Sequence, residues 1–340
     1  HLTRWHGMVI DLFIPHDPAL RCIVLILALM LDAWLGEPQW LWRNLPHPVV
    51  LFGRAIGFFE RHFNRRDRTG RTRRMLGVVA IIILILLAAG TGGGIMAGAS
   101  IGGNALTIPV ELVLVAILIA GRSLDDHTRA VAIALEGGSM KDARRAISMI
   151  VGRNPDALDA HAIARAGIET TAENLSDGVI APALFYLLFG LPGIIAYKMI
   201  NTADSMTGYK SRRYFAYGYG AARIDDLVNL IPARLTGLLI ALASPAGFFG
   251  AIRVMWRDAG RHRSPNAGWP EAAMAARLGL SLAGPRLYGQ RMSQDAPMNG
   301  EGRREATASD IRRSLSLMWR AIALAGLLTG MAGLAIITLT

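Results

Sequence analysis

The residues best suited to chemistry are charged side chains near the middle of the chain. His161, Arg165, Glu169 and Glu173 are spaced by four, so they share one face of a predicted α-helix, and Asp177 follows it. A solvated face held by an Arg165–Glu169 pair would explain this stripe. A catalytic face explains it equally well, because an apolar segment follows at once, and carboxylates at membrane segments are costly and usually functional.

A second polar group lies around two interrupted apolar stretches further along the chain. Its members are Lys198, Asn201, Asp204, Lys210, Arg212, Asp225 and Asp226. Carboxylate and amide oxygens suit Mg²⁺, which usually keeps waters and phosphate oxygens as further ligands. Lys and Arg bind phosphates and carboxylates. The set suits a Mg²⁺–nucleotide or Mg²⁺–diphosphate site, although anchoring of helix ends at the membrane interface is an equal explanation for Arg212.

Other common site patterns are missing from the sequence. It contains no Gly-x-x-x-x-Gly-Lys loop and no His-x-x-x-His pair. Cys22 is the single cysteine, which excludes a disulfide within the chain and a Cys-based metal site. The turn Ser264–Trp269 displays Asn266 and Trp269, and it is either a structural turn or a wall against which a flat ligand stacks.

The elements that must position these residues are membrane helices. Hydrophobic residues make up 52% of the 340, and about 20 helical residues cross the bilayer core. The predicted spans are 19–36, 75–99, 105–121, 179–200, 233–256 and 319–340.

The fourth and fifth spans are interrupted by Pro182, Pro192, Gly193 and Pro245. Broken helices persist at membrane depth only where protein or a wet cavity satisfies the freed backbone groups, so these two spans are candidates for re-entrant pairs. The predicted fold is an all-α polytopic integral membrane protein with broken or re-entrant helices, forming a single membrane domain over 1–340.

The net charge of +11 is distributed unevenly. Arg-rich segments place 37–74, 122–178 and 257–318 in the cytosol, with amphipathic helices, because Lys and Arg stay on the cytoplasmic side. These Arg residues flank membrane segments rather than aromatic-interleaved basic domains, so nucleic acid is not an expected partner.

Local signals divide the polar segments into shorter elements. The capping box Ser123–Asp126 predicts a helix to about Leu135, and a short amphipathic helix is predicted over Lys141–Val151. The chemical stripe lies on a helix over Ala157–Asn174, which Ser176-Asp177-Gly178 is expected to end. A mobile loop is expected over Gln290–Asp310.

Several long motifs together resemble one known family. They are Leu31–Pro38, Pro46–Val50, Glu169–Gly178, Asn201–Gly208, Ala222–Asn229, Pro232–Arg234 and Ser264–Trp269. These strings resemble the cobalamin-biosynthesis CobD/CbiB family, and the resemblance covers about Leu31 to Gly289. It implies adenosylcobinamide-phosphate synthase, an ATP-dependent ligase that joins the free propionate of adenosylcobyric acid to aminopropanol or its O-phosphate. It also implies a multi-pass protein of the bacterial inner membrane with its site facing the cytosol.

With ATP and Mg²⁺ as implied cofactors, the matching residues receive hypothetical roles. The expected Mg²⁺ ligands are Glu173, Asp177 and Asp204, with Asn201 and Asp225 as further candidates. The expected contacts to nucleotide or aminopropanol phosphate are Arg165, Lys198, Lys210 and Arg212. Glu169 or Asp226 is the expected general base. The expected substrate contacts are His47 and Trp269 on the corrinoid side, with Asn266.

Two other functions stay open at this stage. One is a Mg²⁺-dependent membrane transferase acting on a diphosphate, and the other is a non-catalytic AmpE-like signalling or transport protein. The ligase hypothesis requires segment 201–227 to face the cytosol, where ATP is found. Gly-rich spans also permit a homo-oligomer within the lipid bilayer.

Overall fold

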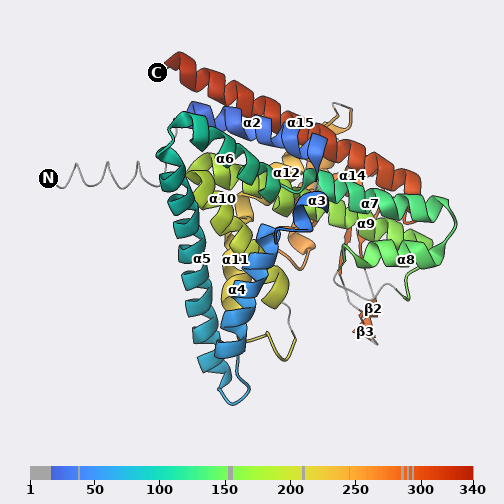
Figure 1. The fold of residues 1–340 in the computed structure, drawn as a ribbon. Coiled ribbons are helices and arrows are strands. Elements are labelled where there is room, and N and C mark those ends of the chain that lie inside the picture. The colour runs from blue at the N-terminus through green and yellow to red at the C-terminus, as the bar shows by residue number, and fades with distance from the viewer. Residues whose placement is uncertain are drawn as a thin grey trace. The chain divides into compact units, whose positions relative to one another are not determined.

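The computed structural model describes residues 17–36, 39–151, 156–208, 211–244, 246–284, 287–288, 291–292 and 295–339. These residues form two compact units built almost entirely from helices (Figure 1). Unit 1 comprises the described residues up to Ile119, with Ala181–Val228 and the chain from Thr329. Unit 2 comprises Ala120–Ile180 and Asn229–Leu328.

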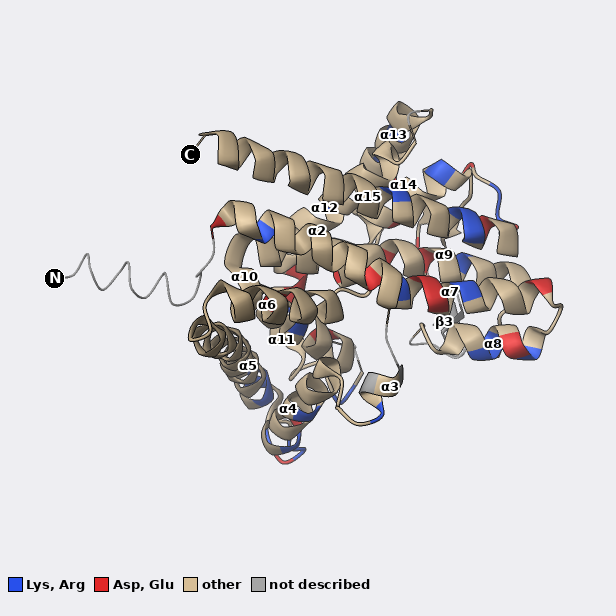
Figure 2. Ribbon diagram, turned by 45° about the horizontal axis from the view of Figure 1, so that its top comes forward, with Lys and Arg blue, Asp and Glu red and all other residues tan. Residues whose placement is uncertain are grey.

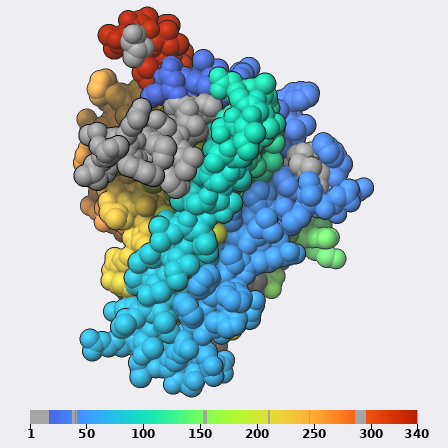
Figure 3. Space-filling view, turned by 60° about the vertical axis from the view of Figure 1, so that its left-hand side comes forward, coloured from blue at the N-terminus to red at the C-terminus, as the bar shows by residue number. Residues whose placement is uncertain are grey.

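Unit 1 is a helical bundle. Its helices are α2 (Pro18–Leu35), α3 (Gln39–Trp42), α4 (Pro48–Phe63), α5 (Gly70–Ser100), α6 (Asn104–Leu118), α10 (Ala181–Thr207), α11 (Tyr219–Val228) and the last turns of α15 (Ala308–Leu339). Helix α2 begins where Asp17 accepts a hydrogen bond from the Ala19 amide at 3.0 Å and Pro18 occupies the first turn. Helix α5 packs along both α4 and α10, and Figure 3 shows it extended beside α4 on one face.

Unit 2 is also helical, with two small sheets. Its helices are α7 (Gly121–Glu136), α8 (Met140–Ser148), α9 (Ala160–Leu175), the π-helical turn η1 (Ser176–Ile180), α12 (Leu230–Leu242), α13 (Phe248–Asp258), the 3₁₀ turn η2 (Ala259–Arg261), α14 (Gly268–Leu278) and most of α15. Strand β1 (Leu282–Ala283) pairs antiparallel with β4 (Pro297–Met298), and β2 (Leu287–Tyr288) pairs antiparallel with β3 (Arg291–Met292).

The described residues contain five helical segments long and apolar enough to cross a membrane. They are Pro18–Leu35, Gly70–Ser100, Asn104–Glu136, Ala160–Thr207 and Ala308–Leu339. Figure 2 shows Lys and Arg gathered where α4 leads into α5, whereas the C-terminal half of α15 is uncharged. The prediction of an all-α polytopic membrane protein is confirmed. The number of crossings, their orientation and the single membrane domain stay predictions.

Both predicted interruptions are present in the structure. Helix α10 is broken at Gly190, which has φ 63° and ψ −154°, two residues before Pro192. The predicted fifth span consists of two helices, α12 and α13, and Gly247 with φ 83° precedes the second; Pro245, the predicted cause, lies outside the described residues.

Two local predictions are wrong, and a third is untested. The Ser123 capping box lies inside α7, which begins at Gly121. The Ser176-Asp177-Gly178 stop signal does not end the helical chain, because the π-helical turn η1 follows α9 and leads to α10. The described part of the predicted mobile loop is held by backbone bonds, from Ser281 to the Arg303 carbonyl at 2.9 Å and from Arg303 to the Gly279 carbonyl at 3.0 Å. These bonds join the loop to the chain after α14, and its mobility stays a prediction.

Candidate functional site

The charged stripe on α9 binds the backbone of one distant segment of unit 2. His161 Nδ1 lies 2.9 Å from the Ala306 carbonyl oxygen, and Arg165 donates to the Arg304 carbonyl at 2.5 Å. Glu169 is 5% exposed, and its Oε1 accepts a hydrogen bond from the Ala283 amide at 2.8 Å. The stripe therefore positions the segment between α14 and α15, a role that the spacing alone did not indicate.

The bond between Glu169 and Ala283 holds an unusual piece of backbone. Ala283 has a φ of 54°, in the left-handed region that a non-glycine residue rarely adopts, and Gly284 follows with a φ of 90°. Such conformations cost about 1–3 kcal/mol and persist only when neighbouring contacts enforce them. The carboxylate of Glu169 supplies one such contact, and its role as general base stays a prediction.

The carboxylates that follow on α9 are more accessible. Glu173 is exposed, and Asp177 is half-buried within η1. A π-helical turn inserts an extra residue into the helical path and frequently occurs at functional sites. Asp177 therefore lies in an irregular helical turn and not in a loop after the helix. Metal binding by Glu173 and Asp177 stays a prediction.

The Ser264–Trp269 turn is fixed by its own hydroxyl group. Ser264 Oγ accepts hydrogen bonds from the amides of Asn266 and Ala267, both at 3.2 Å. Asn266 is 6% exposed. The ring of Trp269 meets Trp256 edge-on at 5.2 Å, and the Arg234 guanidinium lies 4.5 Å from its centre. Part of Trp269 is therefore already covered by Arg234 within unit 2, and its contact with a flat substrate stays a prediction.

The second polar group lies in unit 1, on the second half of α10 and on α11. Lys198 is 8% exposed, and Asn201 and Asp204 are three residues apart on one face of α10. Helix α11 packs against α10. Asp226 on α11 is close enough to Asp204 for their charges to interact. The structure thus brings together two of the predicted site carboxylates that are far apart in sequence.

Near this pair, Asp225 and Arg223 share helix α11 with Asp226. Asp225 is 9% exposed, and Arg223 lies 3.9 Å from the Asp226 carboxylate in a largely solvated ion pair. Arg212 is exposed, and Lys210 lies outside the described residues. Like charges repel, so the pairing of Asp204 with Asp226 is the arrangement expected where a cation or a cationic substrate binds.

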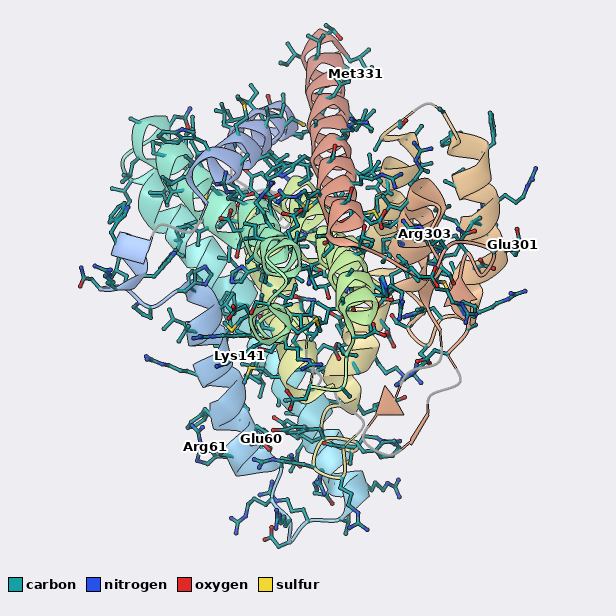
Figure 4. The ribbon with its side chains drawn as sticks, turned by 90° about the vertical axis from the view of Figure 1, so that its right-hand side faces the viewer. Glu60, Arg61, Lys141, Glu301, Arg303 and Met331 are labelled. Carbon is teal, nitrogen blue, oxygen red and sulfur yellow. The ribbon has the colours of Figure 1, made fainter. Side chains whose placement is uncertain are left out.

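A buried carboxylate that sequence reasoning missed holds the segment between α10 and α11. Glu60 on α4 is 6% exposed, and its two oxygens accept hydrogen bonds from Arg213 at 2.9 and 2.8 Å. Arg213 lowers the pKa of Glu60 through these bonds, against the opposing effect of burial, and Asn64 contributes a further bond. The sequence carries only a weak signal that Glu60 is buried. Glu60 follows buried Ile56 by four residues and so shares its helix face, whereas its neighbour Arg61 is exposed (Figure 4).

His47 has a structural role at the start of α4. Its Nδ1 accepts a hydrogen bond from the Val49 amide at 3.2 Å, which caps the helix. Its ring also meets Trp42 edge-on at 4.5 Å. These contacts explain why His47 precedes Pro48 at a helix start, and a corrinoid contact stays a prediction.

The carboxylates fit a loosely held hard cation better than a closed metal cage. Within the part of the chain that the structure describes, no group of three or more His, Cys, Asp or Glu side chains is placed to hold a metal ion. Mg²⁺ usually binds through one or two carboxylates and completes its shell with water and substrate phosphates. Asp204, with Asn201 three residues before it on the same face of α10, fits that requirement, and metal binding there stays a prediction.

Helix content, membrane-length apolar segments and buried charges at broken helices define a polytopic α-helical membrane protein. A family model described as CobD/Cbib protein matches residues 25–318. The chain belongs to the CobD/CbiB family. The match includes every predicted site residue.

Curated relatives match over most of their length. The Cobalamin biosynthesis protein CobD of Brucella suis biovar 1 (strain 1330) is 48% identical over 323 residues, covering 90% of this chain and 94% of the relative. The protein of the same name from Sinorhizobium sp is 48% identical over 304 residues, covering 88% and 94%. That from Rhodobacter capsulatus is 44% identical over 309 residues, covering 88% and 93%. No solved structure matches the chain.

Proposed function

We propose that this chain is a membrane enzyme of cobalamin biosynthesis that catalyses an ATP-dependent amide ligation. It joins the free propionate of adenosylcobyric acid to aminopropanol or aminopropanol O-phosphate, and its site faces the cytosol of the bacterial inner membrane. The observation that supports this proposal most directly is the family match over residues 25–318, together with relatives named for cobalamin biosynthesis.

The reaction must activate a carboxylate, which is a poor acylating agent. The propionate oxygen attacks the γ-phosphorus of ATP, the bond to ADP breaks, and an acyl phosphate forms. The amine then attacks the acyl carbon, phosphate leaves, and the ammonium proton passes to a base. This sequence forms one amide and consumes one ATP, giving ADP and phosphate, and it needs residues that bind phosphates, orient an amine and accept a proton.

The polar group on α10 and α11 supplies residues of these kinds. Asp204 would hold Mg²⁺, with Asn201 on the same face of α10, and the ion would neutralise charge on the transferred phosphoryl group. Lys198 on α10 and Arg212, which lies between α10 and α11, would bind phosphate oxygens. Asp226 is half-buried and contacts Arg223, so it is a more accessible candidate base than Glu169, which is 5% exposed and already binds the Ala283 amide.

The decisive experiment is reconstitution of the purified protein in proteoliposomes. With adenosylcobyric acid, aminopropanol phosphate, ATP and Mg²⁺, we expect one ADP and one phosphate for each amide formed, and no ATP turnover when either substrate is omitted. Asp67→Asn, at a carboxylate that is 65% exposed and pairs with solvated Arg65, should leave this stoichiometry unchanged. Amide formation without ATP, or ATP turnover without amide, would refute the proposal.

A further inference from the structure

The break in α10 leaves backbone groups that must find partners elsewhere. In a continuous helix the Leu188 carbonyl would accept from the amide of residue 192, but Pro192 has no amide hydrogen. Gly190, with a φ of 63°, also turns the following chain away from the helical path. At membrane depth an unsatisfied carbonyl is strongly unfavourable, because no water is available to replace the lost bond.

Arg21 on α2 supplies the missing donors. Its Nη1 donates to the Leu187 carbonyl at 3.1 Å and to the Leu188 carbonyl at 3.3 Å. Arg21 is 6% exposed, so the guanidinium sits inside unit 1 at the C-terminal end of the first half of α10. A cation at that end also interacts favourably with the helix dipole. Arg21 is therefore a helix cap contributed by a different helix.

A buried acid on a third helix lies near Arg21. Glu111 on α6 is 1% exposed and interacts with the charge of Arg21 and with the hydroxyl of Tyr186. Tyr186 is 0% exposed and lies in the last turn of α10 before the break. Arg21, Glu111 and Tyr186 therefore join α2, α6 and α10 at the break in one buried polar cluster.

Close packing gives the break a defined geometry. A Cβ on Gly92 of α5 would lie 2.6 Å from Pro192 Cα, and a Cβ on Gly193 would collide with the Phe185 carbonyl. Both positions therefore have room for glycine only. A proline and closely packed glycines therefore cause the kink in α10, which is not a flexible hinge.

We propose that Arg21 is a positioning residue, which sets the direction of the second half of α10 and so the position of Lys198, Asn201 and Asp204. This inference rests on the proposed function for its effect on catalysis. Asp204 is 14 residues beyond Gly190, so it stands about 21 Å along the helix from the break. A change of about 5° in direction would displace its carboxylate by about 2 Å, and a displacement of 1 Å can lower a rate by about 100-fold.

The geometry can be measured without any assay of activity. In a Cys22→Ala background, spin labels at Ile82→Cys on α5 and Ser205→Cys on α10 report the distance between a fixed helix and the second half of α10; both side chains are exposed. Arg21→Met should shift the mean distance by about 2 Å or broaden its distribution. Arg21→Lys, which keeps the charge and one donor group, should restore part of the wild-type distribution. Arg54→Met, an exposed arginine of α4, is the matched control and should change nothing.

A double variant separates capping from charge balance. Arg21→Met with Glu111→Gln removes both buried charges, so it should recover thermal stability lost in Arg21→Met while keeping the altered distance. A wild-type distance distribution in this double variant would overturn the proposal, because the cap would then not set the direction of α10.

The ligase assay tests the functional consequence. We expect kcat to fall by about 10- to 100-fold in the double variant, with partial recovery in Arg21→Lys, while KM for the corrinoid changes by less than about 3-fold. An altered distance with unchanged kcat would overturn the positioning role. An inactive wild-type protein would instead refute the proposed function, and the distance measurements would then decide the structural part alone.

Discussion

Replacing Glu60 by alanine should loosen the segment 211–218, which connects the α10 and α11 carboxylates. In the wild-type protein Arg213 binds both oxygens of Glu60, at 2.9 and 2.8 Å, and the Arg213 carbonyl in turn accepts from Arg73. The alanine variant removes the carboxylate that binds the Arg213 guanidinium. The exposed guanidinium would then move into solvent and stop holding the segment against α4.

The size of the effect follows from the burial of the two partners. A hydrogen bond to a charged group contributes about 1.5–3 kcal/mol, whereas an exposed ion pair contributes about 0.2–1 kcal/mol. The Glu60 side chain is 8% exposed and that of Arg213 is 60% exposed, so solvent screens the pair from one side. We therefore expect the free energy of local opening to fall by about 1–2 kcal/mol, which raises the opening equilibrium constant by about 5- to 30-fold.

Amide hydrogen exchange measures this opening directly. The amides of Tyr214, Phe215 and Gly218 donate backbone hydrogen bonds within the segment, to the Ser211 or Tyr214 carbonyls. Their exchange should accelerate by about 5- to 30-fold in Glu60→Ala. Asp67→Asn, which removes an ion pair exposed on both sides, should leave it unchanged. Equal rates in Glu60→Ala and the wild type would refute the reasoning.

The same pair should make stability depend on pH in one direction. Arg213 lowers the pKa of Glu60 below the ordinary value of 4.5, so the folded state favours the charged carboxylate. Stability from this source is complete above pH 4.5 and is lost as the pH falls through the lowered pKa. The Tm difference between the wild type and Glu60→Gln should therefore be constant at neutral pH and shrink in acid. A difference that grows below pH 4.5 would contradict this assignment.

Three further outcomes are expected. Gly77→Ala should destabilise unit 1 by about 1–3 kcal/mol in thermal unfolding, because its Cβ would collide with the Tyr217 carbonyl. Gly90→Ala in the same helix, where nothing lies within 4 Å, should not destabilise it. Asp204→Asn should raise the Mg²⁺ concentration for half-maximal ligation at least about 10-fold, and an unchanged titration would remove the metal assignment. A label on Ser211→Cys should react from the cytosolic side, and reaction only from the periplasm would exclude an ATP site at 201–227.

Helices α9 and α10 show which structural features a local sequence pattern predicts and which it does not. Apolar composition predicted a helix around 179–200, and Pro192 with Gly193 predicted its break, because missing amides act within one turn. The four-residue spacing likewise predicted the stripe on α9. The Ser176-Asp177-Gly178 signal did not end the helical chain, because the π-helical turn η1 follows α9 there and leads to α10.

The sequence alone determined the class of the protein, through long apolar runs and Arg-rich flanks, and its motifs indicated the family. Only the tertiary structure decided which charges meet. Arg213 binds Glu60 from 153 residues away, and Arg21 caps carbonyls 166 and 167 residues away. A charged side chain looks the same in sequence whether it is solvated, structural or catalytic. Its partner depends on how distant helices pack, and that packing distinguishes buried Glu60 from its exposed neighbour Arg61.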